Sequence, residues 1–191
     1  MAEAGEVRTE KEEQLDAEAR ARRRLALAQI RQYPDPVLRM QAREVESFDV
    51  DLRRLVERMR GLMADASGVG LAATQVGVLR RVFVFQRGEE ETLVLVNPRI
   101  VERNDETEVA DEGCLSLPGV LVPVERSTAV TIEGTDERGE QVRLELTELP
   151  ARVVQHEVDH LDGTLILDRT TAEARREALA SLRPKLELDV V

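Results

Sequence analysis

The sequence predicts an α+β domain in which antiparallel strands are preceded and followed by helices. Apolar residues at helical spacing occur before Ala66 and again after Pro150, and the section between them carries short runs rich in β-branched residues. Strands that follow one another without alternating helices are typical of α+β proteins. A chain of 191 residues is long enough for one such domain with its own core.

The first elements follow from charge and capping. Residues 1–27 are rich in Glu, Ala and Arg and offer little to bury, so we expect a charged extension, disordered or loosely helical, outside the core. Residues 28–183 are expected to form the single domain, and residues 184–191 a tail. Asp35 is placed to cap a short helix that has Pro36 in its first turn.

The remaining elements follow from periodicity. Residues 51–66 repeat apolar side chains at steps of three and four, which predicts a core helix. Helical spacing returns in residues 150–163, where Gly163 favours a stop, and in residues 171–183 before Pro184. The predicted strands are residues 81–86, 92–98, 120–125, 127–134 and 141–147, with turns at 87–89 and 136–139.

The composition excludes several classes of function. The chain has 27 Lys and Arg against 38 Asp and Glu, a net charge of −11, which argues against nucleic-acid binding by the field of the whole protein. We find no membrane-length apolar run and no signal-peptide pattern at the start. The single cysteine, Cys114, cannot form a disulfide within the chain and indicates a reducing compartment. We therefore expect a cytoplasmic protein with no membrane partner.

The strongest chemical signal is the segment from His156 to His160. On a helix these two side chains share one face and can bind one metal ion, and Glu157 beside them can take a proton from water. The alternative is a helix with two solvated histidines. Both histidines of the protein have this spacing, which favours the metal site.

A catalytic metal centre usually has a third protein ligand, and Cys114 is the available soft donor. Taken alone, a single cysteine is more often a small buried hydrophobe. Together with the histidine pair, a ligand is the better interpretation. A Cys/His/His set suits zinc or ferrous iron.

Residues 68–77 form a glycine-containing segment with two interpretations. Gly68-x-Gly70-x-x-Ala73 weakly matches a dinucleotide-binding pattern, but a helix precedes it and a strand follows, which is the wrong context. The favoured interpretation is that Gly68 and Gly70 allow a peptide backbone to approach a sheet edge, with Gln75 as a neutral amide donor.

Three ordered segments together resemble bacterial-type peptide deformylases: Gly68 to Gln75, Glu112 to Ser116, and Gln155 to His160. The resemblance covers roughly residues 30–170. It implies antiparallel sheets packed around a central metal-binding helix. It also implies that residues 28–183 are the catalytic domain, which hydrolyses the N-formyl group of the initiator N-formylmethionine of nascent polypeptides and releases formate.

The resemblance also implies the roles of individual residues. Cys114, His156 and His160 would hold one divalent ion, Fe(2+) in the cell, which Zn(2+), Ni(2+) or Co(2+) can replace. Glu157 would move the proton of the attacking water. The remaining roles are donors to the carbonyl oxygen (Gln75 and the backbone of Leu115), backbone partners of the peptide (Gly70 and Gly113), walls of the methionine pocket (Val69, Leu115 and Val153) and supporting residues (Gln155 and Arg126).

Two rival functions remain open at the level of the sequence. A zinc endopeptidase shares the two histidines but usually takes its third ligand beyond the helix. A structural metal site needs a fourth ligand, for which Asp159 and Asp162 are nearest. The arginines of residues 171–183 indicate a solvated face or, alternatively, a contact with the ribosome.

Overall fold

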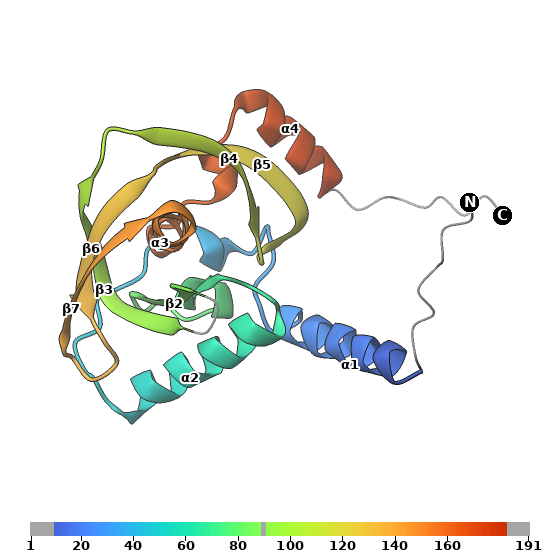
Figure 1. Ribbon diagram of the computed structural model, residues 1–191, viewed down its shortest axis with the longest axis horizontal. Helices are drawn as coiled ribbons and strands as arrows, with labels where there is room; N and C mark the ends of the chain where they lie inside the picture. Colours follow the sequence, from blue (N-terminus) through green and yellow to red (C-terminus); the bar gives the residue numbers. More distant parts are fainter. Residues whose placement is uncertain (1–9, 89–90, 183–191) are drawn as a thin grey trace, which may run out of the picture.

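The computed structural model describes residues 10–88 and 91–182, which form two antiparallel sheets around a central helix (Figure 1). The elements in chain order are α1 (Glu10–Leu27), η1 (Pro36–Arg39), α2 (Val50–Asp65), β1 (Gly70–Ala72), η2 (Ala73–Val76), β2 (Val82–Gln86), β3 (Thr92–Arg103), β4 (Thr107–Cys114), β5 (Leu117–Ser127), β6 (Ala129–Thr135), β7 (Gln141–Thr147), α3 (Glu148–Leu161), η3 (Ile166–Asp168) and α4 (Ala172–Ser181).

The larger sheet has the strand order β1-β2-β3-β6-β7, and the smaller sheet consists of β4 and β5. Every pair within the sheets is antiparallel. Helix α3 lies inside the curve of the strands, and α2 and α4 cover the outside (Figure 1). The predicted α+β class and the central helix are confirmed.

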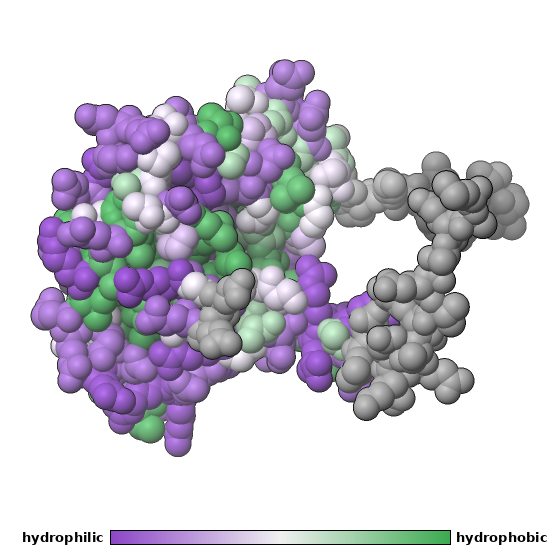
Figure 2. Space-filling view, viewed as in Figure 1, coloured by the Kyte–Doolittle hydropathy of each residue, from purple (hydrophilic) through white to green (hydrophobic). Residues whose placement is uncertain are grey.

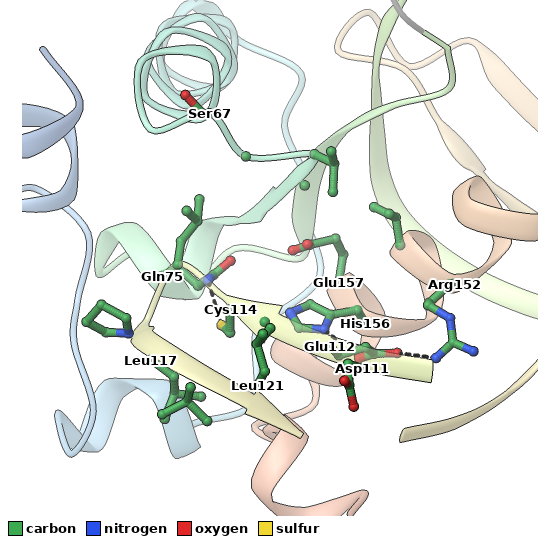
Figure 3. A pocket seen from close by; sticks show the side chains of 18 of the residues that line it. Ser67, Gln75, Asp111, Glu112, Cys114, Leu117, Leu121, Arg152, His156 and Glu157 are labelled. Carbon is green, nitrogen blue, oxygen red and sulfur yellow. Dashed lines mark hydrogen bonds and ion pairs between the residues drawn. The ribbon is translucent and has the colours of Figure 1, made fainter. Parts of the chain in front are cut away.

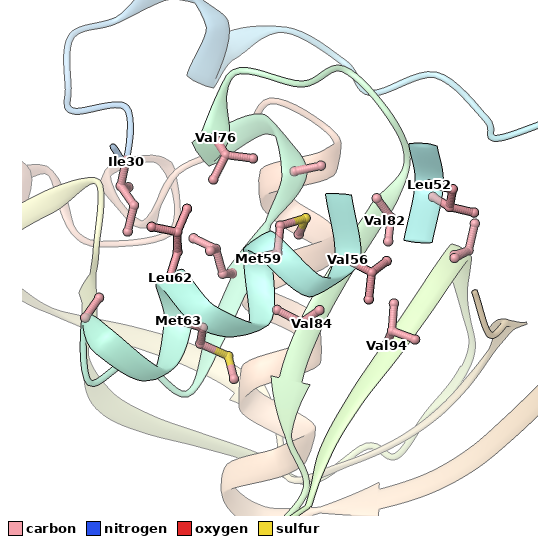
Figure 4. Packing of buried hydrophobic residues seen from close by; sticks show 14 of the residues in the cluster. Ile30, Leu52, Val56, Met59, Leu62, Met63, Val76, Val82, Val84 and Val94 are labelled. Carbon is pink, nitrogen blue, oxygen red and sulfur yellow. The ribbon is translucent and has the colours of Figure 1, made fainter. Parts of the chain in front are cut away.

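Strand β2 is buried on both faces, which explains its unbroken run of apolar residues. Successive side chains of a strand point to opposite faces. Val82 and Val84 therefore join the cluster under α2 that contains Met59 and Val94 (Figure 4). Phe83 and Phe85 point the other way, into the cluster under α3. The two faces fix α2 and α3 on opposite sides of the same strand.

A third apolar cluster joins the smaller sheet to the C-terminal helix. Leu117, Val122 and Val124 of β5 pack with Ile166 and with Ala178 of α4. This contact holds the β4–β5 hairpin in place beside α3. No helix in the described part of the chain has the length and apolar character that crossing a membrane requires.

Several local predictions are confirmed in position. Asp35 caps η1 by accepting a hydrogen bond from the N–H of Val37 at 3.0 Å. Helix α3 ends at Leu161, and Gly163 follows with φ = +73°, a conformation that glycine adopts without strain. The segment after β6 forms the expected turn at residues 136–139, whereas the expected turn at 87–89 lies partly outside the described residues.

Two features differ from the sequence prediction. Strand β4 was not predicted, because its one well-buried side chain is the charged Glu112 and no apolar alternation marks it. The N-terminal stretch is helical as α1, one of the two forms expected, but Ala26, expected outside the core, is buried in the cluster under α2. Residues 1–9 and 183–191, including the expected tail, lie outside the described residues.

Candidate metal centre

Helix α3 and the end of β4 bring three metal-ligating side chains together. His156 and His160 lie one turn apart on α3, with ring centroids 4.9 Å from each other. The sulfur of Cys114 lies 3.2 Å from Nε2 of His160. One ligand atom from each of the three residues lies within 4.8 Å of the others. A soft sulfur and two imidazoles, drawn from distant segments, thus converge on one point.

The electrostatics of this cluster suit a divalent cation. Burial lowers the pKa of His160 well below its usual value, so its ring stays neutral, which is the form that binds metal. Burial also acts to lower the pKa of His156, but hydrogen bonds with Cys114 and Glu112 outweigh it and raise that pKa well above the usual value. The surroundings of His156 therefore favour positive charge, and the three residues fit a metal ion.

Glu112 orients His156. Nδ1 of His156 donates to the Glu112 carboxylate at 3.0 Å, which leaves Nε2 for a metal ion. The same carboxylate accepts two hydrogen bonds from Arg126, both at 3.0 Å. It also accepts one from Arg152 at 2.9 Å (Figure 3). Burial acts to raise the pKa of Glu112, but the bonds from His156 and Arg126 lower it to about 2. Glu112 therefore stays ionised behind the metal centre.

Gln75 is locked with its amide nitrogen toward the cluster. Its Oε1 accepts a hydrogen bond from the N–H of Ala72 at 2.9 Å, which fixes the orientation of the amide. Nε2 then faces the Oγ of Ser116 at 3.1 Å. It also faces the sulfur of Cys114 at 3.6 Å (Figure 3). The side chain is only 1% exposed, so its N–H donors lie preorganised in a buried site.

Glu157 lies beside the cluster with a carboxylate oxygen that no described residue binds. Its side chain is buried, and Oε2 has no hydrogen-bond partner among the described residues. Burial raises the pKa of Glu157 to about 7, and the charge of Glu112 acts in the same direction. A carboxyl group with a pKa near neutrality can both accept and donate a proton at physiological pH.

A cavity of about 510 Å³ opens onto this cluster between β1 and the β4–β5 hairpin. Apolar side chains gather in the hollow at the centre of the face shown in Figure 2. Gly70 lines the cavity, and a side chain at this position would collide with Glu157 and Val153. Strand β1 is an edge strand, so its outer side is open to a peptide backbone.

The structure places most of the predicted site residues on the wall of this one cavity. The lining includes Val69, Gly70, Gln75, Gly113, Cys114, Leu115, Val153, His156 and Glu157. His160 lies behind them and is 1% exposed. Gln155 and Arg126 lie outside the cavity. Gln155 joins α3 to the backbone of Ser127, and Arg126 links Glu112 to Asp159.

The carboxylates considered as a fourth metal ligand are engaged elsewhere. Asp159 accepts hydrogen bonds from Arg126 at 2.5 Å and from Arg169 at 2.6 and 3.1 Å. Asp162 accepts one from Arg81 at 2.7 Å. This pairing removes both from the metal centre and disfavours a closed, purely structural site.

The sequence analysis missed the residues that brace the site from behind. The N–H of Arg31 donates to the carbonyl of Gln75 at 2.7 Å, and Nε2 of Gln32 donates to the carbonyl of Leu115 at 3.0 Å. Tyr33 N–H donates to the carbonyl of Ser116 at 2.9 Å. The two backbone bonds leave no trace in the residue types, and the side-chain bond of Gln32 depends on a partner 83 residues away, so no local sequence pattern marks them.

Comparison with known proteins gives one consistent result. The sequence model of the family described as "Polypeptide deformylase" matches residues 27–176. The peptide deformylase of Desulforudis audaxviator is 45% identical over 153 residues, which cover 80% of this chain and 99% of that protein. The crystal structure of the Thermotoga maritima peptide deformylase is 48% identical, covers 74% of this chain and 96% of its own, and superposes with a TM-score of 0.72. The crystal structure of peptide deformylase 1B of Arabidopsis thaliana in complex with an inhibitor is 42% identical. It covers 81% of this chain and 89% of its own, and superposes with a TM-score of 0.77.

We expect Glu112→Gln to weaken metal binding by about 10- to 100-fold, because a neutral amide orients and polarises His156 less strongly. Competition with a chelator measures the affinity. Glu108→Gln is the matched control, since Glu108 lies on the same strand and, within residues 10–88 and 91–182, its exposed carboxylate pairs only with Arg152, at 3.7 Å. An unchanged affinity in a folded Glu112→Gln protein would show that the carboxylate does not support the ligand.

Proposed function

Because the chain belongs to the peptide deformylase family and hydrolyses the N-formyl group of N-formylmethionine on nascent chains in a metal-dependent reaction, we propose that Cys114, His156 and His160 hold its metal ion. The observation that carries this assignment is the 3.2 Å approach of the Cys114 sulfur to Nε2 of His160. The family match, residues 27–176, also supports residues 28–183 as the single catalytic domain.

Glu157 is proposed as the group that moves the proton. A divalent ion, when bound, supplies Lewis acidity that activates water and polarises the formyl carbonyl. The buried Oε2 of Glu157 accepts the proton of the attacking water, whose oxygen bonds to the formyl carbon. As the C–N bond breaks, Glu157 returns this proton to the amine nitrogen. Formate leaves, and the methionine amine becomes free.

Gln75 and Leu115 are proposed as donors to the carbonyl oxygen while it gains negative charge. Nε2 of Gln75 is held toward the cluster by the bond between Ala72 and Oε1. Leu115 lies in the turn between β4 and β5, and its carbonyl is fixed from behind by Gln32. Donors aimed in advance at developing charge are worth about 3–4 kcal/mol each in catalysis.

The walls of the cavity are proposed to bind the formylated peptide. Gly70 and Gly113 present backbone at the two sides of the cavity and can bond with the substrate backbone. Val69, Leu115 and Val153 give an apolar wall that fits the methionine side chain.

The ion in the cell is proposed to be Fe(2+), with Zn(2+), Ni(2+) or Co(2+) able to replace it. One sulfur and two imidazole nitrogens form a donor set that all four ions accept. The choice of iron comes from the usual metal of the family.

The C-terminal helix is proposed to contact the ribosome, where nascent chains emerge. A cytoplasmic location is proposed together with this contact. Arg175 and Arg176 are exposed on α4, and Ala178 attaches the same helix to the core. The exposed cations can meet the anionic surface of ribosomal RNA without involving the metal centre.

We expect Glu157→Ala to release formate from a formylated methionyl peptide at least about 100-fold more slowly, with its metal content retained. Gln75→Ala should lower kcat about 100-fold with a smaller change in KM, because its hydrogen bond strengthens in the transition state. Formate release and metal analysis on the same samples measure both. Glu177→Ala, an exposed change on α4, is the control. Loss of metal from Glu157→Ala would make Glu157 a structural residue, and a pure KM effect would exclude Gln75 as the oxyanion donor.

We expect the ferrous enzyme to lose activity in air while the nickel enzyme retains it, since a thiolate beside ferrous iron is open to oxidation. Samples loaded anaerobically with each metal are exposed to air, and formate release is followed with time. Equal durability of the two forms would contradict this expectation.

We expect the double variant Arg175→Glu/Arg176→Glu to co-sediment less with ribosomes than the unmodified chain, because charge reversal repels RNA phosphates. Formate release by the variant serves as the control for folding. Equal co-sedimentation would contradict a ribosome contact through α4.

A further inference from the structure

Helix α1 extends the wall of the substrate cavity beyond the part of the chain that matches the family. The family match begins at residue 27, the last residue of α1. Two residues of this helix, Arg23 and Leu27, line the same cavity as Cys114 and Glu157. The mouth of the cavity is therefore shaped by a helix that lies almost entirely outside the shared domain.

The position of α1 is fixed by packing and by one hydrogen bond. Ala26 is buried in the cluster under α2, and Leu27 packs against the same cluster. Nε of Arg23 donates to the carbonyl of Ala66, the C-cap residue of α2, at 3.2 Å. A carbonyl at the C-terminal end of a helix is an electronegative partner for a guanidinium. This bond uses one of the five N–H groups of Arg23 and holds the cation at the mouth of the cavity.

The order of the wall residues places Arg23 away from the catalytic end of the cavity. Gly70 lies against Glu157 and marks the catalytic end. From there the wall runs back through Gly68 to Ser67, which is labelled in Figure 3. The next residue back along the chain is Ala66, whose carbonyl binds Arg23. An extended peptide advances about 3.3 Å per residue. A peptide with its formyl group beside Glu157 would place roughly its third to fifth residue near Arg23.

Arg23 differs from the other charged residues of the cavity wall. Arg152 and Glu112 are bonded to each other, and Glu112 is buried. Asp111 is exposed on β4, across the cavity from β1 and α1 (Figure 3). The protein as a whole, with a net charge of −11, repels acidic peptides. An exposed guanidinium at this position supplies a local attraction of the opposite sign.

We propose that Arg23 forms a subsite for a carboxylate side chain near the third to fifth residue of the formylated peptide. This inference rests on the proposed function, because it assumes that the peptide lies along β1 with its formyl group beside Glu157. It adds to that function a preference for acidic nascent chains, contributed by a helix outside the family domain.

The test uses C-terminally amidated formyl-Met-Ala peptides with Asp, Lys or Ala scanned through positions three to five. Amidation removes the terminal carboxylate, and unamidated versions show whether that group binds instead of a side chain. At low salt we expect kcat/KM to favour Asp over Lys by about 3- to 10-fold at one position. The preference should shrink as salt is added.

Variants of α1 assign the preference to one side chain. Arg23→Gln should abolish the Asp preference, and Arg23→Glu should invert it in favour of Lys. Inversion distinguishes an electrostatic role from a displaced helix, which would only abolish the preference. Arg22→Gln, an exposed neighbour that does not line the cavity, should retain it.

Two different failures are distinguishable. If the unmodified protein releases no formate from the Ala peptide, the proposed function fails. If it releases formate but treats Asp and Lys peptides alike, or if both Arg23 variants keep the original preference, the subsite is overturned. A preference for the unamidated peptides alone would overturn the assignment to a side chain.

Discussion

The site depends on one buried carboxylate. Glu112 lies on β4, receives hydrogen bonds from Arg126 and Arg152, and holds His156 on α3. Burying an ionised group without partners costs free energy, so Arg126 and Arg152 are required for Glu112 to stay ionised and to orient His156. These contacts also join the smaller sheet to the helix that carries both histidines. The metal centre and the packing of the smaller sheet against α3 thus share one set of ion pairs.

Helix α3 lies between two sheets, so even polar residues of this helix are buried. Its buried face includes Gln155, Glu157, Asp159 and His160 as well as apolar side chains. Gln155 and Asp159 have hydrogen-bond partners, whereas Oε2 of Glu157 and Nδ1 of His160 have none among the described residues. Unpartnered polar atoms in a core cost free energy. The unpartnered atoms of α3 thus belong to Glu157 and His160, the residues placed in the reaction and in the metal centre.

The sequence predicted what periodicity and residue type record, and missed what depends on distant partners. Helices α2, α3 and α4, the buried strand β2 and the spacing of the two histidines follow from local patterns. Cys114 was predicted to join the histidines from its residue type. Strand β4 was not predicted because its inward side chain, Glu112, is charged, and the arginine partners of Glu112 lie 14 and 40 residues away in the sequence. The docking of α1 escaped for a similar reason, since only Ala26 of its last turn is buried and one alanine gives no apolar stripe.

The division between the buried centre and its exposed rim explains how an added helix can change selectivity without changing the reaction. Gln75 and His156 are fixed by buried hydrogen bonds, so moving them would break several of these bonds at once. Arg23 is exposed and acts on a part of the substrate several residues from the formyl group. A contact made equally in the bound and transition states alters which peptides bind and leaves the chemical step alone. Selectivity can therefore vary at the rim of the cavity while the Cys114, His156 and His160 cluster stays constant.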